Sequence, residues 1–99
     1  MTKNYFVYIN TTKTNGVFYI GVTNNLIRRN SEHKNKTHDS FTAKYNITKL
    51  VYCQQFNNIN DAISYEKKLK KWSRTKKIWL IKKQNPEFED LSKEFYPCK

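Results

Sequence analysis

Residues 5–9 read YFVYI and residues 17–22 read VFYIGV, and these two runs decide how the chain folds. Both are rich in β-branched and aromatic residues, which favour extended strands. The polar segment at residues 10–16 separates them and closes with the pair Asn15-Gly16, a frequent hairpin turn. The two runs therefore predict a β-hairpin.

Alternation along the hairpin predicts which side chains share a face, because successive residues of a strand point to opposite sides. The more apolar faces of the two strands carry Tyr5, Val7, Ile9, Phe18, Ile20 and Val22. If both faces turn toward the core, paired residues have numbers with an odd sum, and Tyr8 and Tyr19 lie together on the other face. Pairing Asn10 with Val17 would set these two tyrosines opposite each other.

The rest of the chain predicts one more strand and several helices in the order ββαβαα. The expected elements are a helix from Asn25 to about Lys34, a strand at Lys49–Phe56 and a helix from Asn58 or Asn60 through Ser73. A further helix should begin at Ser73 or a neighbouring residue and end before Pro86, followed by a short turn around Asp90–Lys93. The polar stretch at residues 35–46 shows no clear periodicity. We expect it to be a loop that contacts substrate.

Size and composition indicate one small globular protein. A chain of 99 residues has room for one core, and 37% hydrophobic with 15% aromatic residues is too apolar for disorder, so we expect a single domain over residues 1–99. No run approaches the length of a membrane span, and residues 1–9 lack the features of a signal peptide, which favours a cytoplasmic protein without a membrane partner. Cys53 and Cys98 show no metal-ligand spacing, and we expect reduced thiols.

The charge balance favours a polyanionic partner. Nineteen Lys and Arg against eight Asp and Glu give +11, a surplus that attracts nucleic acid and releases counterions when it binds. The expected nucleic-acid-binding residues lie around the junction of the last two helices: Lys67, Lys68, Lys70, Lys71, Arg74, Lys76 and Lys77. The alternative is that lysines only keep a small protein soluble.

Glu66 is the best candidate for a metal ligand. Ala62 lies four residues before it and Leu69 three residues after it, so its carboxylate should point toward the sheet. Mg²⁺ prefers oxygen ligands and keeps several waters, so one carboxylate with a substrate phosphate oxygen can hold it. The alternative is a glutamate at the edge of the apolar stripe that pairs with Lys70.

Four further side chains suit phosphodiester cleavage, which needs an activated oxygen nucleophile and positive charge around phosphorus. Arg29 can bind phosphate oxygens through its planar guanidinium, and His33, one helical turn later, can hold phosphate or assist proton transfer. Tyr19 can orient or deprotonate a water, with Tyr8 beside it as a second hydroxyl. The alternatives are a solvated basic helix face and two tyrosines that only pack.

These residues occur in an order that resembles the GIY-YIG nuclease superfamily. The matching features are Phe6-Val7-Tyr8 in the first strand, Tyr19-Ile20-Gly21 in the second, and then Arg29, His33 and Glu66. The resemblance covers about residues 4–85, leaving 86–99 as a C-terminal extension. It looks like small stand-alone bacterial members and like the N-terminal domain of the excision-repair nuclease C subunit, which is involved in DNA repair.

The resemblance implies an α+β fold, a three-stranded antiparallel sheet flanked by helices, and a site that uses Mg²⁺ or another divalent cation such as Mn²⁺. It implies that Tyr19 is the general base and Tyr8 its hydrogen-bonding companion. Arg29 would stabilise phosphate, Glu66 would bind the metal, and His33 would occupy a position held by Tyr or His. Two residues depart from the pattern, because Phe6 replaces a glycine and Val22 stands where repair relatives carry a lysine.

The sequence thus predicts a divalent-metal-dependent endonuclease that hydrolyses DNA by tyrosine-assisted attack of water, with RNA as a second possible substrate. One alternative is a weak or inactive nuclease-fold module that binds DNA or RNA without cutting it. A further alternative is a subunit whose specificity comes from a protein partner.

Overall fold

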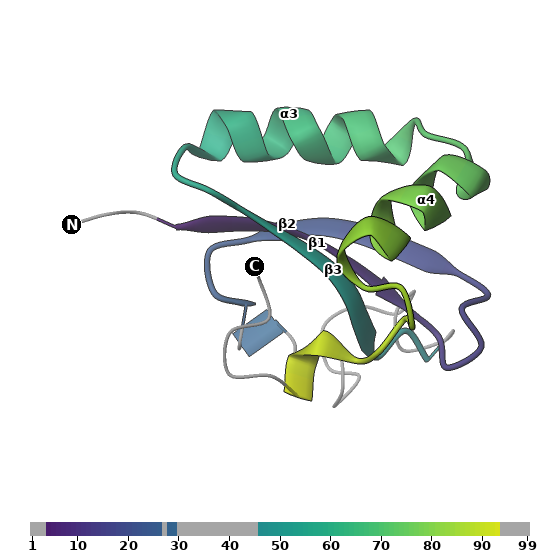
Figure 1. The fold of residues 1–99 in the computed structure, drawn as a ribbon. Coiled ribbons are helices and arrows are strands. Elements are labelled where there is room, and N and C mark those ends of the chain that lie inside the picture. The colour runs from purple at the N-terminus through teal and green to yellow at the C-terminus, as the bar shows by residue number, and fades with distance from the viewer. Residues whose placement is uncertain (1–3, 27, 30–45, 94–99) are drawn as a thin grey trace.

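The computed structural model describes residues 4–26, 28–29 and 46–93. Its elements, labelled as in Figure 1, are β1 (Tyr5–Thr11), β2 (Phe18–Thr23), β3 (Lys49–Phe56), α3 (Ile59–Lys70), α4 (Arg74–Gln84) and the 3₁₀ turn η1 (Leu91–Lys93). The strands form an antiparallel sheet in the order β2-β1-β3. The predicted α+β architecture is confirmed.

The hairpin register confirms the predicted faces and corrects the predicted pairing. Asn10 pairs with Tyr19, so paired residues have an odd sum as expected, but Tyr8 lies opposite Gly21 rather than Tyr19. The expected pairing of Asn10 with Val17 is wrong by two residues. The turn explains the difference, because the Thr12 hydroxyl accepts a hydrogen bond from the Gly16 amide (2.9 Å) and Thr11 donates to the Val17 carbonyl (2.6 Å).

Capping side chains place the helix starts where the sequence predicts them. Asn58 accepts a hydrogen bond from the Asn60 amide (2.7 Å) at the start of α3, and Ser73 accepts one from the Lys76 amide (3.2 Å) at the start of α4. The α3 helix ends at Lys70, earlier than the expected Ser73.

Asn25 begins the helix that follows β2, and its side chain accepts from the Arg28 amide (3.0 Å). Residues 26, 28 and 29 are helical, and the rest of the helix expected to reach Lys34 lies outside the described residues. The same is true of the predicted loop up to residue 45.

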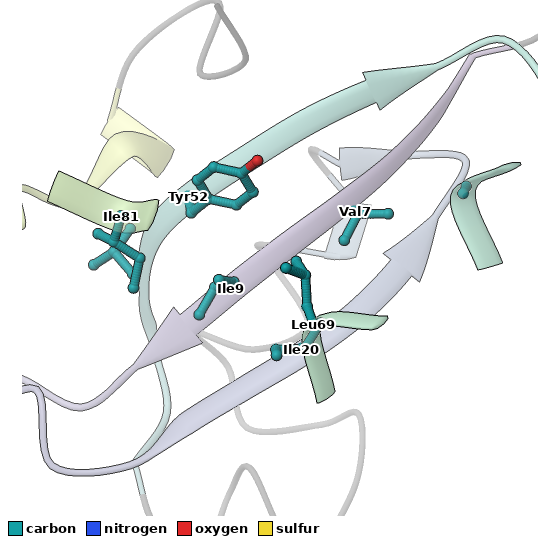
Figure 2. Packing of buried hydrophobic residues seen from close by; sticks show 8 residues of the cluster. Val7, Ile9, Ile20, Tyr52, Leu69 and Ile81 are labelled. Carbon is teal, nitrogen blue, oxygen red and sulfur yellow. The ribbon is translucent and has the colours of Figure 1, made fainter. Parts of the chain in front are cut away.

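The sheet carries apolar side chains on both faces. On one face, strand residues pack against Ala62 and Leu69 of α3 and Ile81 of α4. Figure 2 shows Val7, Ile9, Ile20, Tyr52, Leu69 and Ile81 of this cluster. On the other face, Tyr8 packs with Leu26, Leu50, Cys53 and Leu91. Accordingly, α3 lies above the sheet in Figure 1, and η1 and the helix start after β2 lie below it.

Side chains after β3 bind the outer edge of that strand. Gln84 accepts from the Cys53 amide (3.2 Å) and donates to the Cys53 carbonyl (3.0 Å), in the manner of a neighbouring strand. Asn85 donates to the Val51 carbonyl (3.1 Å), and Asp90 accepts from the Leu50 amide (3.2 Å). These bonds fix the end of α4 and the segment before η1 to the sheet.

The expectation of two reduced thiols is wrong for Cys53, which takes part in a disulfide bond. Sequence separation does not reveal which side chains meet in space, and the spacing therefore gave no sign of the bond. Cys98 lies outside the described residues. Among the helices that the structure describes, none is long and apolar enough to cross a membrane.

Candidate active site

Tyr8 and Tyr19 lie on the same face of the sheet, as alternation predicts. Their ring centroids are 6.4 Å apart and the rings are tilted by 32°. Tyr8 comes from the central strand and is only 1% exposed, whereas Tyr19 lies on the edge strand β2 and is partly exposed. Tyr19 is therefore the more accessible of the two.

Gly21 is required by the packing of Tyr8 and not by an unusual backbone. Its φ is not positive, but a Cβ at this position would lie 2.4 Å from the Tyr8 Oη and 2.6 Å from Cζ. The phenol of Tyr8 thus crosses β2 directly over Gly21, with its hydroxyl end beside the strand that carries Tyr19. The tyrosine of the first triplet and the glycine of the second form one packed unit.

The middle residues of the two triplets point the other way. Val7 and Ile20 are buried in the core beneath α3. Val22, which stands where repair relatives carry a lysine, packs on this same core face, while Phe6 packs on the tyrosine face against the cluster around Tyr8. Each triplet therefore combines a core position with positions on the tyrosine face.

A pocket lies at the outer edge of β2. Phe18, Tyr19, Ile20, Lys70 and Lys77 line a volume of about 340 Å³. Phe18 and Ile20 belong to the α3 face and Tyr19 to the opposite face, so the pocket opens around the edge of the strand and not on one face alone. Two lysines are among its lining residues, which suits an anionic ligand.

Glu66 lies on α3 and forms an ion pair with Lys70, at 3.6 Å between Nζ and Oε2. Its side chain is 18% exposed, against 55% for Lys70. The carboxylate is thus partly turned inward, as expected, and the alternative of a pair with Lys70 is also confirmed. Because α3 packs on the face opposite Tyr8, Glu66 approaches the pocket from the other side of β2, through its contact with Lys70.

The remaining predicted catalytic residues follow β2. Arg29 lies in the first turn of the helix after this strand and is partly buried. Leu26 of the same turn packs against Tyr8, which places this helix start on the tyrosine face. The structure therefore brings Tyr8, Tyr19 and the turn that carries Arg29 to one face. His33 lies outside the described residues.

The seven predicted nucleic-acid-binding residues do not form one surface. Lys70 and Lys77 line the pocket beside Tyr19, whereas Lys67, Lys68 and Lys71 line a second hollow, and Lys76 lies over Trp72. Arg74 is used within the fold. Its guanidinium donates to the carbonyls of Asn15 and Gly16 and lies 4.7 Å from the ring centre of Phe18, so it ties the hairpin turn to the start of α4.

Asn10 is a candidate that the sequence argument missed. It is 1% exposed, and its buried Oδ1 has no hydrogen-bond partner among the residues that the structure describes. It lies two residues after Tyr8 on the same face and directly opposite Tyr19. The sequence carries a signal for this position, because Asn10 continues the alternation of the first strand and would place a polar side chain on a packed face. We had instead predicted that Asn10 belongs to the turn segment.

Comparison with known proteins identifies relatives over most of the chain. Residues 4–79 match the family model of the GIY-YIG catalytic domain. A UPF0213 protein of Clostridium perfringens is 36% identical over 89 residues, which cover 90% of this chain and 95% of that protein. A UPF0213 protein of Syntrophus aciditrophicus is 35% identical over 88 residues, covering 88% and 98% of the two chains.

The fold is also similar to a solved structure. The solution NMR structure of a UPF0213 protein from Bacillus halodurans superposes with a TM-score of 0.57 at 27% identity, over 93% of this chain and 97% of that one. The name UPF0213 states no activity or substrate. Family match, relatives and fold agree with the triplets on the hairpin, and the chain belongs to the GIY-YIG domain family.

Proposed function

We propose that the protein is a divalent-metal-dependent endonuclease that hydrolyses DNA phosphodiester bonds at the outer edge of β2. One observation carries the proposal: Tyr19 shares a pocket with Lys70 and Lys77 in a chain of a nuclease-fold family. A phosphodiester placed along this edge would meet cationic groups and a phenol at once.

The residues around the pocket have distinct tasks in this proposal. The ammonium groups of Lys70 and Lys77 bind the phosphate, and the phenol of Tyr19 is the group that accepts a proton from water. Tyr19 orients the attacking water. Tyr8, held over Gly21, fixes the position of Tyr19 through ring packing, and Arg29 binds phosphate oxygens from the tyrosine face.

Glu66 would hold the divalent cation. Its carboxylate supplies the oxygen donor that Mg²⁺ or Mn²⁺ prefers, and its limited exposure restricts its rotamers. Among the residues that the structure describes, no three His, Cys, Asp or Glu side chains are close enough to hold a metal together, so the proposal rests on one carboxylate with several waters. The bound cation would supply positive charge for the oxygens around phosphorus.

The test is incubation of the purified protein with linear, nicked, branched and single-stranded DNA and with RNA, in Mg²⁺ or a chelator. Glu66→Gln keeps the shape of the side chain and removes its charge, so we expect divalent-dependent cleavage to fall at least about 100-fold while nucleic-acid affinity changes little. Glu87→Gln, at an exposed position, is the matched control and should cleave like the wild type. Equal cleavage by both variants would reject the metal assignment.

A second function, nucleic-acid binding without cleavage, is favoured by one observation. Lys70 already neutralises Glu66, and a carboxylate engaged in an ion pair binds a cation less readily. Lys70→Met, compared with the wild type for both affinity and cleavage, separates the two functions. A nuclease that needs Lys70 for phosphate binding loses cleavage and affinity together, whereas a binding module loses affinity and shows no divalent-dependent cleavage in either form.

A further inference from the structure

We propose that the outer face of α3 is a second nucleic-acid site, separate from the β2 pocket, which holds another stretch of the substrate by its phosphates. The inference rests on the proposed function in one respect, that the substrate is a nucleic acid. It does not require that the chain cuts it.

Helical spacing creates this surface. Ser64, Lys67, Lys68 and Lys71 follow one another at offsets of three and four residues and therefore share a face of α3. They line, with Trp72, a hollow of about 520 Å³. The buried residues Ala62 and Leu69 mark the nearly opposite side of the helix, so the hollow faces away from the sheet.

Trp72 forms an apolar wall of the hollow. The indole packs partly against the core beneath α3. Over its ring, the Nζ of Lys76 lies 4.2 Å from the centroid and that of Lys68 lies 5.7 Å away. The ring attracts both cations, which come from different helices.

The charge at this hollow is not neutralised within the described part of the chain. Lys70 pairs with Glu66, but none of Lys67, Lys68, Lys71 and Lys76 pairs with a carboxylate there. Four unneutralised ammonium groups around one hollow repel each other, and an anion relieves that repulsion. Lysines are point charges without the planar fork of arginine, which suits a phosphate backbone better than a particular base.

The second site cannot be an extension of the first. Lys70 and Lys77 reach the β2 edge, whereas Lys67, Lys68 and Lys71 project from the far side of a helix about 10–12 Å across. One phosphate cannot contact both groups. A strand or duplex arm that occupies the outer hollow would raise the local concentration of its neighbouring segment at the β2 pocket.

The experiment compares two triple variants with the same change in charge. One carries Lys67→Ser, Lys68→Ser and Lys71→Ser; the control carries Lys13→Ser, Lys82→Ser and Lys93→Ser at exposed positions elsewhere. Affinity for fluorescein-labelled DNA and RNA is measured by anisotropy across a salt series. We expect the slope of log K against log[salt] to decrease by about 2 to 3 in the α3 variant and by less than about 1 in the control. Equal slopes in the two variants would overturn the proposal.

A second measurement does not depend on removing lysines. The chain has two tryptophans, so Trp79→Phe leaves Trp72 as the only indole and the main source of emission. We expect nucleic acid to quench this emission, and the α3 triple variant in the same background to lose the quenching; unchanged emission on binding would also overturn the site.

Cleavage assays on the same proteins keep the two proposals apart. A wild type that never cleaves but shows the slope difference would refute the nuclease and retain the outer site. A wild type that cleaves nucleic acid, with equal salt slopes in the two triple variants, would retain the nuclease and refute the outer site.

Discussion

Replacing Gly21 by alanine tests the packing of Tyr8 directly. The new Cβ would lie 2.4 Å from Oη and 2.6 Å from Cζ of Tyr8, so the ring must move by nearly 1 Å to restore ordinary contact at 3.4 Å. Tyr8 is only 1% exposed and is surrounded by Leu26 and Leu50, which leaves it little room. Overpacking of this kind costs about 1–3 kcal/mol.

The backbone partly offsets that cost. The φ of Gly21 is not positive, so alanine gains roughly 0.4–1 kcal/mol by restricting the unfolded chain. The net expectation is a loss of about 1.5 kcal/mol, or a fall in Tm of roughly 6 °C or more for a domain of this size. Gly16→Ala is the control, because its Cβ would meet only threonine hydroxyls, at 3.5 and 3.6 Å.

Urea denaturation followed by circular dichroism measures these free energies. In a Tyr8→Leu background the ring is absent, and Gly21→Ala should then cost little. Displacement of Tyr8 should also lower kcat if its ring positions Tyr19. A Gly21→Ala protein as stable as the wild type, or equally destabilised with and without Tyr8, would refute the reasoning.

Three further predictions concern stability. Burial and the hydrogen bond with Tyr65 (2.8 Å) raise the pKa of Tyr52, so the folded protein keeps this phenol neutral while the unfolded chain ionises it above about pH 10. The free energy of unfolding therefore falls as the pH rises above about 10. When the pH is raised to 11, it should fall by roughly 1 kcal/mol more in the wild type than in Tyr52→Phe, and Tyr65→Phe should behave like the wild type. Asn85→Ala removes three hydrogen bonds of 2.8–3.1 Å and should destabilise by about 3 kcal/mol in urea, and a loss under about 1 kcal/mol would contradict the role given to Asn85. Asn10→Leu removes a buried acceptor that has no partner within the described part of the chain, so it should raise the free energy of unfolding by about 1 kcal/mol and the melting temperature with it; a lower melting temperature would show that the acceptor stabilises the fold.

Features fixed by local chemistry could be predicted from the sequence. Ser73 begins α4 because its own hydroxyl satisfies an amide three residues later, and such caps depend on adjacent residues alone. The faces of the hairpin follow from alternation, which needs only the parity of the register. The same parity is enough to predict that Tyr8 and Tyr19 lie on one face.

Features set by contacts between distant segments could not be predicted. Arg74 looked like one more cation for nucleic acid, but its guanidinium binds the hairpin turn, 58 and 59 residues away in the sequence. The register depended on hydrogen bonds made by Thr11 and Thr12 in the turn. The division of the lysines into two groups required the position of α3 relative to β2, and periodicity alone does not give that position.

The side chains that bind the outer edge of β3 limit how the protein can associate with itself. Within the described residues, β2 has no strand on its outer side, while Gln84, Asn85 and Asp90 occupy the backbone groups of β3. A sheet with two open edges can polymerise without end. With β3 closed, antiparallel addition of a second copy at β2 would give one continuous sheet and then stop at a dimer, with both β2 pockets covered at the seam.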